Sequence, residues 1–160
     1  MEMAVSVRAA RRPRKARTVD AITSPTMSDR VDYEALARLR YELRKFQAFS
    51  SAAATKAGLT PQQHQALLII RGFSDPDPVS IGDLAKYLLI RHHTAVELVD
   101  RMTRLELISR VMDGADARRV LVKLTREGEK RLQKLSEIHL KELQAIGPTL
   151  AGMLKPFQRP

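Results

Sequence analysis

A short β-rich segment between two helical stretches constrains this chain more than any other feature of its sequence. Residues 107–112 alternate enough to form a strand, and residues 118–124, RRVLVKL, have the pattern of a return strand. The intervening residues 113–117 open on Asp-Gly, which favours a tight reversal. Thr125 then caps a new helical pattern with glutamates near its start. The sequence therefore predicts one β-hairpin within an otherwise helical protein.

The residues before the hairpin have the spacing of a helix-turn-helix motif. Thr60-Pro61 and Ser80 are capping signals that open two helices, the second over 81–88. After a polar interruption at residues 90–93, a further helix is predicted over 94–106. A hairpin directly after such a helix pair is typical of a winged helix. Its arginines would then meet phosphates and the narrow minor groove; the alternative is a surface hairpin with ordinary solubilising charges.

Long amphipathic helices are predicted on both sides of this region. After Val31, apolar residues recur at steps of three and four, and the helix that they predict should end at Gly58. A second long helix should follow Thr125 and break at Gly147-Pro148, before a last short helix. Their apolar stripes exceed what a monomer exposes, so pairing with a second copy is expected. The predicted fold class is mainly α with a small β-hairpin: a winged helix-turn-helix over 59–124, with long dimerisation helices over 31–58 and 125–157.

The first thirty residues differ from the rest in charge and pattern. They carry seven basic and three acidic residues without sustained periodicity, so residues 1–30 are predicted to be a disordered basic tail. Such a tail would add phosphate contacts or act as an organelle transit peptide. A third interpretation places the native start at Met27, where ordered pattern begins.

Composition narrows the class of function. The net charge of +10 points to a polyanionic partner, nucleic acid before an anionic membrane surface. Cysteine is absent, which excludes disulfides and zinc–cysteine sites and fits the cytoplasm, and no apolar run approaches the ~20 residues of a membrane span. There is no glycine-rich phosphate loop or cysteine nucleophile, so no enzyme and no cofactor are predicted. Metal binding at the adjacent His92 and His93 is not expected, because neighbouring helical residues point roughly 100° apart.

Several segments together resemble the multiple antibiotic resistance regulator (MarR) family. Asp116-Ala117-Arg118, followed by VLVKLT and Gly128, resembles the family's wing signature. "LTPQQHQALL" resembles the start of its second helix, and "TAVELVDRMTRLELISR" its recognition helix and next strand. The resemblance covers about residues 31–157. It implies a homodimeric transcription regulator, commonly a repressor, that binds a pseudo-palindromic double-stranded DNA operator and is released by a small aromatic or phenolic effector.

The resemblance also implies where this chain contacts DNA. The recognition-helix positions are Arg91, His92, His93, Thr94, Glu97 and Arg101. On the wing, Arg118 would reach DNA and Asp116 would orient it, while Arg110 and Arg119 would add phosphate contacts. The His-His pair stands where serine is more usual, and Glu97 where a basic or small polar residue is common. Glutamate can accept a hydrogen bond from cytosine but repels phosphate. The two departures therefore bear on which DNA sequence is recognised and not on the mode of binding.

Two histidines and two residues of the first long helix are candidates for a second site. His64 and His139 are interpreted as hydrogen-bonded, partly buried core residues, with a ligand pocket as the alternative. Arg44, Phe46 and His64 would line an effector cavity, since an anionic aromatic ligand needs a cation and an apolar wall. The competing interpretation places Phe46 in the core and Arg44 in solvent.

Two other functions fit the charge. A non-specific DNA-coating or architectural protein would show uniform, salt-sensitive binding. A protein-interaction module would use its basic tail to bind an acidic partner or membrane, and would lose that activity without residues 1–30.

Overall fold

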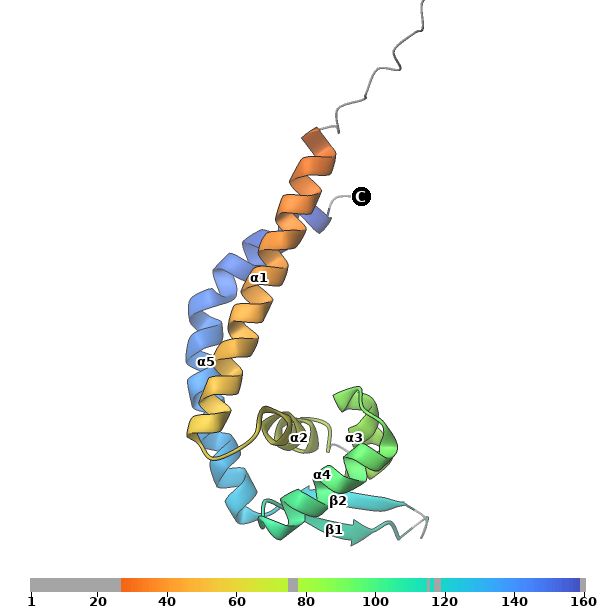
Figure 1. The fold of residues 1–160 in the computed structure, drawn as a ribbon. Helices are drawn as coiled ribbons and strands as arrows, with labels where there is room; N and C mark the ends of the chain where they lie inside the picture. The colour runs from red at the N-terminus through yellow and green to blue at the C-terminus, as the bar shows by residue number, and fades with distance from the viewer. Residues whose placement is uncertain (1–26, 75–77, 115, 117–118, 159–160) are drawn as a thin grey trace, which may run out of the picture.

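Two long helices rise from a smaller body in this protein (Figure 1). The computed structural model describes residues 27–74, 78–114, 116 and 119–158. Within these ranges the elements are α1 (Met27–Lys56), α2 (Pro61–Gly72), α3 (Ile81–Leu88), α4 (His92–Arg104), β1 (Ile108–Met112), β2 (Val120–Leu124), α5 (Arg126–Leu154) and the short 3-10 helix η1 (Lys155–Gln158). The long helices α1 and α5 run side by side, while α2, α3, α4 and the hairpin form the body. The predicted fold class, mainly α with one hairpin in winged-helix order, is confirmed.

Local capping sets where α2 and α3 begin. The Thr60 hydroxyl accepts from the Gln63 backbone N–H at 3.2 Å, and the Gln63 side chain accepts from the Thr60 N–H at 2.8 Å. Ser80 and Asp83 form the same reciprocal capping box at the start of α3. Each box satisfies two of the N–H groups that a helix start leaves without partners. Both starts, and the bounds of α3, agree with the sequence prediction.

The hairpin is joined to the helical body through its second strand. Its antiparallel register pairs Ile108 with Leu124 and Met112 with Val120. On the other edge of β2, the Val122 N–H donates to the carbonyl of Val79 at 2.9 Å, and Ser80 forms an isolated bridge with Leu121. The backbone just before α3 therefore extends the small sheet, so the wing and the first helix of the helix-turn-helix share hydrogen bonds.

Aliphatic side chains from every element of the body fill one core. Its largest fully buried members include Leu67, Ile70, Leu84, Leu98, Met102, Leu107 and Ile108. Leu135 of α5 joins them, so the long helix is anchored in the body by its first half. This aliphatic packing is what the low aromatic content of the sequence requires.

Three helix boundaries predicted from the sequence were wrong. The helix α1 begins at Met27, so residues 27–30 belong to it and not to the predicted tail, whereas residues 1–26 lie outside the described residues. The helix α4 begins at His92 because Arg91 is extended and occupies the N-cap position. Helix α5 continues through Pro148, and the predicted break does not occur. The preceding residue, Gly147, has no Cβ to clash with the proline ring, which removes one of the usual reasons for a helix to stop.

None of the helices in the described part of the chain is long and apolar enough to cross a membrane.

Candidate DNA-binding site

Helix α4 presents a polar face away from the core. Its inward side buries Ala95, Leu98, Val99 and Met102. Of the predicted recognition residues, Thr94 is half-buried, and the exposed ones are Arg91, His92, His93, Glu97 and Arg101. Positions 93, 97 and 101 are four residues apart, so their side chains form one stripe along the helix. Within this stripe the Arg101 guanidinium lies 3.9 Å from the Glu97 carboxylate.

The start of α4 lacks the capping box found at the starts of α2 and α3. Its N-cap residue, Arg91, makes no side-chain capping bond, and its first turn, like that of α2, contains no acidic residue. The backbone N–H groups at this end and the positive end of the helix dipole are therefore not neutralised by a local carboxylate. An exposed helix start of this kind suits an incoming phosphate.

The predicted wing residues fall into two groups. Arg110 on β1 forms an ion pair with Asp100 of α4, and Arg119 lies 3.6 Å from Asp83 and 3.6 Å from Asp113. These two arginines are therefore engaged within the protein. Asp116 is exposed, and its carbonyl accepts from the Arg119 N–H at 2.9 Å. The predicted contact of Arg118 with DNA, and its pairing with Asp116, concern a residue outside the described part of the chain.

A cleft of about 400 Å³ opens between the start of α3, the start of α4 and the hairpin. It is lined by Ser80, Ile81, Gly82, His92, Val96, Arg110, Arg119 and Val120. Helix α4 and the hairpin thus border one concave surface. The sequence placed these two elements together only through their order along the chain.

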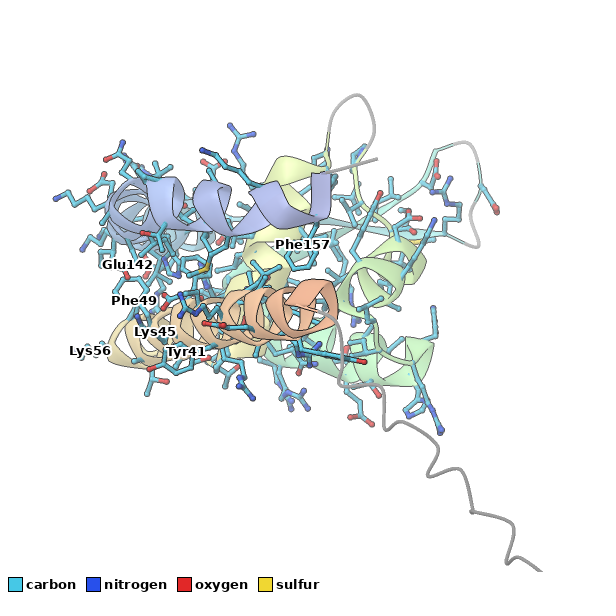
Figure 2. The ribbon with its side chains drawn as sticks, turned by 90° about the horizontal axis from the view of Figure 1, so that it is seen from above. Tyr41, Lys45, Phe49, Lys56, Glu142 and Phe157 are labelled. Carbon is cyan, nitrogen blue, oxygen red and sulfur yellow. The ribbon has the colours of Figure 1, made fainter. Side chains whose placement is uncertain are left out.

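A second cluster lies where α1, α2 and α5 meet. His139 of α5 lies at the centre, with ring centroids 6.0 Å from Phe46, 5.7 Å from Phe49 and 4.6 Å from His64. Figure 2 shows Phe49 on the side of α1 that faces α5. Of the predicted pocket residues, Phe46 and His64 both contact this cluster, whereas Arg44 is exposed.

The hydrogen bonds of His139 indicate its tautomer. Its Nδ1 lies 2.7 Å from the carbonyl oxygen of Leu135, and its Nε2 lies 2.8 Å from the Ser50 hydroxyl. A carbonyl only accepts, so Nδ1 carries the proton and, in the neutral ring, Nε2 accepts from Ser50. The prediction of a hydrogen-bonded, buried His139 is confirmed.

The corresponding prediction for His64 is wrong. The residue is 1% exposed, and neither ring nitrogen has a hydrogen-bond partner among the described residues. Burial, with a smaller effect of the neighbouring His139, lowers the pKa of His64 from 6.5 to about 4. The ring is therefore neutral at neutral pH. The local sequence of α2 does not reveal this, because the burial and hydrogen bonding of His64 depend on side chains from other helices.

The helices α1 and α5 and the 3-10 helix η1 expose large apolar side chains. Leu140 is 57% exposed and Leu43 51% exposed, and the others include Tyr33, Leu36, Leu143, Leu154 and Phe157. Figure 2 shows Phe157 beside the early turns of α1, which η1 contacts. This apolar face lies away from the winged body.

The order of the elements and the pairing of β2 with the start of α3 define the class: a winged helix-turn-helix protein. Residues 57–119 match the sequence model of the MarR family. A curated relative, the uncharacterized HTH-type transcriptional regulator YsmB of Bacillus subtilis, is 35% identical over 77 residues, which are 48% of this chain and 51% of that protein. The chain thus spans about half the length of the curated relative it matches.

Solved structures show a similar likeness in fold. A MarR family protein from Bacillus stearothermophilus is 26% identical with a TM-score of 0.67, covering 76% of this chain and 82% of that one. The MepR–DNA complex of S. aureus is 25% identical with a TM-score of 0.55, covering 77% of this chain and 98% of that one. Over residues 57–119 and in its fold, the chain is therefore similar to MarR family proteins, the likeness that its wing signature indicated.

Proposed function

We propose that this chain is a sequence-specific regulator of transcription, acting as a repressor, that binds double-stranded DNA as a homodimer. The observation that carries the proposal is the start of α4. It lies beside the hairpin, has no side-chain cap, and exposes arginine and histidine side chains. Such a helix fits the major groove while a wing lies along the adjacent backbone. The likeness to MepR, which was solved with DNA, supports this role.

The apolar face of α1 and α5 supports the homodimer. Seven large apolar side chains named above are exposed there in a single chain. A contiguous apolar surface on two long helices is stable in water only when it is covered. A second copy covers it with an identical surface and thereby supplies a second recognition helix related by two-fold symmetry.

A footprint of the protein on the DNA upstream of its own gene tests this function. We expect two protected half-sites roughly 10 base pairs apart, because two symmetric recognition helices enter successive major grooves. In Arg91→Ala, the slope of log affinity against log salt should fall by about one unit. Arg126→Gln, which removes an exposed arginine at the start of α5, is the matched control and should leave the footprint unchanged.

Uniform coverage that disappears at moderate salt would contradict the proposal. It would instead indicate a non-specific DNA-coating protein driven by the net charge of +10. A single unrepeated site would contradict the homodimer.

We further propose that a small phenol or aromatic carboxylate acts as effector at the junction of α1, α2 and α5. His64 has buried ring nitrogens without partners among the described residues, and Phe46 and Phe49 pack against the adjacent His139. A ligand entering there would gain a hydrogen bond that the protein itself does not satisfy, together with aromatic contacts. The junction connects the long helices to the DNA-binding body, so a change in packing there would alter the distance between the two recognition helices.

Release of the footprinted duplex by simple phenols and aromatic carboxylates tests this site. We expect ligands that release the wild type to act about fivefold more weakly on His64→Leu, since one hydrogen bond is typically worth about 1 kcal/mol. DNA binding without ligand should be retained in this variant. Equal release of both proteins would place the effector elsewhere.

A further inference from the structure

Arg119 occupies a junction between three elements at the base of the wing. Its guanidinium lies 3.6 Å from the Asp83 carboxylate in the first turn of α3 and 3.6 Å from the Asp113 carboxylate just after β1. Its backbone also pairs across the hairpin, where its carbonyl accepts from the Asp113 N–H at 3.2 Å. The residue itself immediately precedes β2. One side chain thus connects the helix-turn-helix to both strands of the wing.

The acidic partner on α3 is itself held in place. The Ser80 hydroxyl donates to the Asp83 carboxylate at 2.6 Å, and the Ser80 backbone N–H donates to it at 3.3 Å. The hydroxyl bond chiefly, with smaller contributions from the charges of Arg119 and Lys86, lowers the pKa of Asp83. The carboxylate is therefore ionised at neutral pH, and the two bonds from Ser80 orient it independently of Arg119.

The charges around this cleft do not favour a phosphate at Arg119. Arg110 and Arg119 both line the cleft, and they lie against three carboxylates, those of Asp83, Asp100 and Asp113. A DNA phosphate that approached Arg119 would have to displace two of these carboxylates or lie beside them. Like charges at such distances repel, and the repulsion is only partly screened at physiological salt.

We propose that Arg119 is a positioning residue that holds the wing against α3 by bridging Asp83 and Asp113, and that it does not neutralise a DNA phosphate. This inference rests on the proposed DNA-binding function. It changes the role that the family resemblance implied for Arg119. The bridge lies next to the hydrogen bonds between β2 and residues 79–80, so it holds the described strands of the hairpin in one orientation relative to α3.

Two measurements on the full chain test the bridge. Hydrogen exchange of the free protein monitors the amides of residues 108–114 and 119–124 in wild type, Arg119→Gln, Asp83→Asn and the double variant. Asparagine at position 83 keeps an oxygen that can accept from Ser80. We expect Asp83→Asn, which removes one ion pair, to speed exchange about twofold to fivefold, and Arg119→Gln, which removes both, to speed it more. The double variant should exchange no faster than Arg119→Gln alone.

The second measurement is the salt dependence of binding to a duplex carrying the footprinted site and to a random duplex of equal length. For Arg119→Gln we expect weaker binding with an unchanged salt slope, whereas Arg91→Ala lowers the slope by about one unit. Arg126→Gln is the control for loss of one surface charge and should change neither measurement. The conservative Arg119→Lys should retain the slope but not the exchange protection, because an ammonium does not span two carboxylates as a planar guanidinium does.

The outcomes separate this inference from the function on which it rests. A slope lowered by about one unit in Arg119→Gln would overturn it, because the arginine would then contact a phosphate. Unchanged exchange in the wing, or additive effects in the double variant, would also overturn it. If the wild type shows no preference for the footprinted duplex, the proposed function fails, and the exchange measurement still decides whether the bridge exists in the free protein.

Discussion

Replacing Gly128 by alanine is expected to lower the free energy of unfolding by about 3 kcal/mol or more, near the upper end for an overpacked site. A Cβ at this position would lie 2.0 Å from the carbonyl oxygen of Leu107. That oxygen belongs to the backbone and accepts from the Thr125 N–H at 3.1 Å, so it cannot move aside as a flexible side chain would. The first turn of α5 would have to separate from the start of the hairpin, which breaks the joint between the body and the long helix.

Gly152 in the same helix provides the matched control. No heavy atom lies within 4 Å of a Cβ built there, and the next residue is not a proline. Gly152→Ala should therefore raise stability by about 0.5–1 kcal/mol, the ordinary difference between alanine and glycine inside a helix. Urea unfolding of both variants at equal protein concentration measures the effects. Equal midpoints for wild type and Gly128→Ala would show that the close approach of α5 to Leu107 does not exist in solution.

Acidification is expected to destabilise the protein through His64. Burial lowers its pKa from 6.5 to about 4, so between these values the unfolded chain binds a proton that the folded chain does not. Stability therefore rises with pH across this window and is lost as the pH falls from 6.5 to 4. The full loss is about 3 kcal/mol below pH 4, at 1.36 kcal/mol for each pH unit by which the pKa is lowered.

Substitution of His64 isolates this contribution. His64→Leu and His64→Gln do not titrate, so both should lose less stability than the wild type between pH 6.5 and 4. Leucine should also be the more stable of the two at every pH, because glutamine again buries a polar group that lacks partners. Urea unfolding over the pH series is the measurement. Parallel curves for wild type and His64→Leu would mean that water or a partner reaches the imidazole in solution.

Local signals in the sequence were enough to predict most elements. Thr60-Pro61 and Ser80 mark helix starts because capping is a property of four consecutive residues. Gly58 has a φ of +73°, and this left-handed turn ends α1 as its residue type indicated. The same reasoning failed where the residue type is unusual. Leu89, with a φ of 55°, forms the turn between α3 and α4, and leucine gives no turn signal.

The candidate site was predictable only in part. The exposed positions on α4 follow from helical spacing once the inward face is known, and five of the six predicted residues are exposed. The partners of the wing arginines were not predictable, since Arg110 and Arg119 pair with carboxylates from other elements. The assignment of Arg119 to a phosphate came from the family resemblance, which says nothing about the acids that lie nearby in this chain.

Local sequence signals were enough for the order of elements, the capped starts of α2, α3 and α5, and the hairpin, because capping, turn chemistry and hydrophobic spacing act over a few residues. The tertiary structure alone decided that His64 is buried without hydrogen-bond partners among the described residues, that Gly128 touches the backbone of Leu107, and that Arg119 lies between Asp83 and Asp113. Each of these depends on the distance between residues far apart in the chain. Such distances are set when the whole core packs, and no local pattern encodes them.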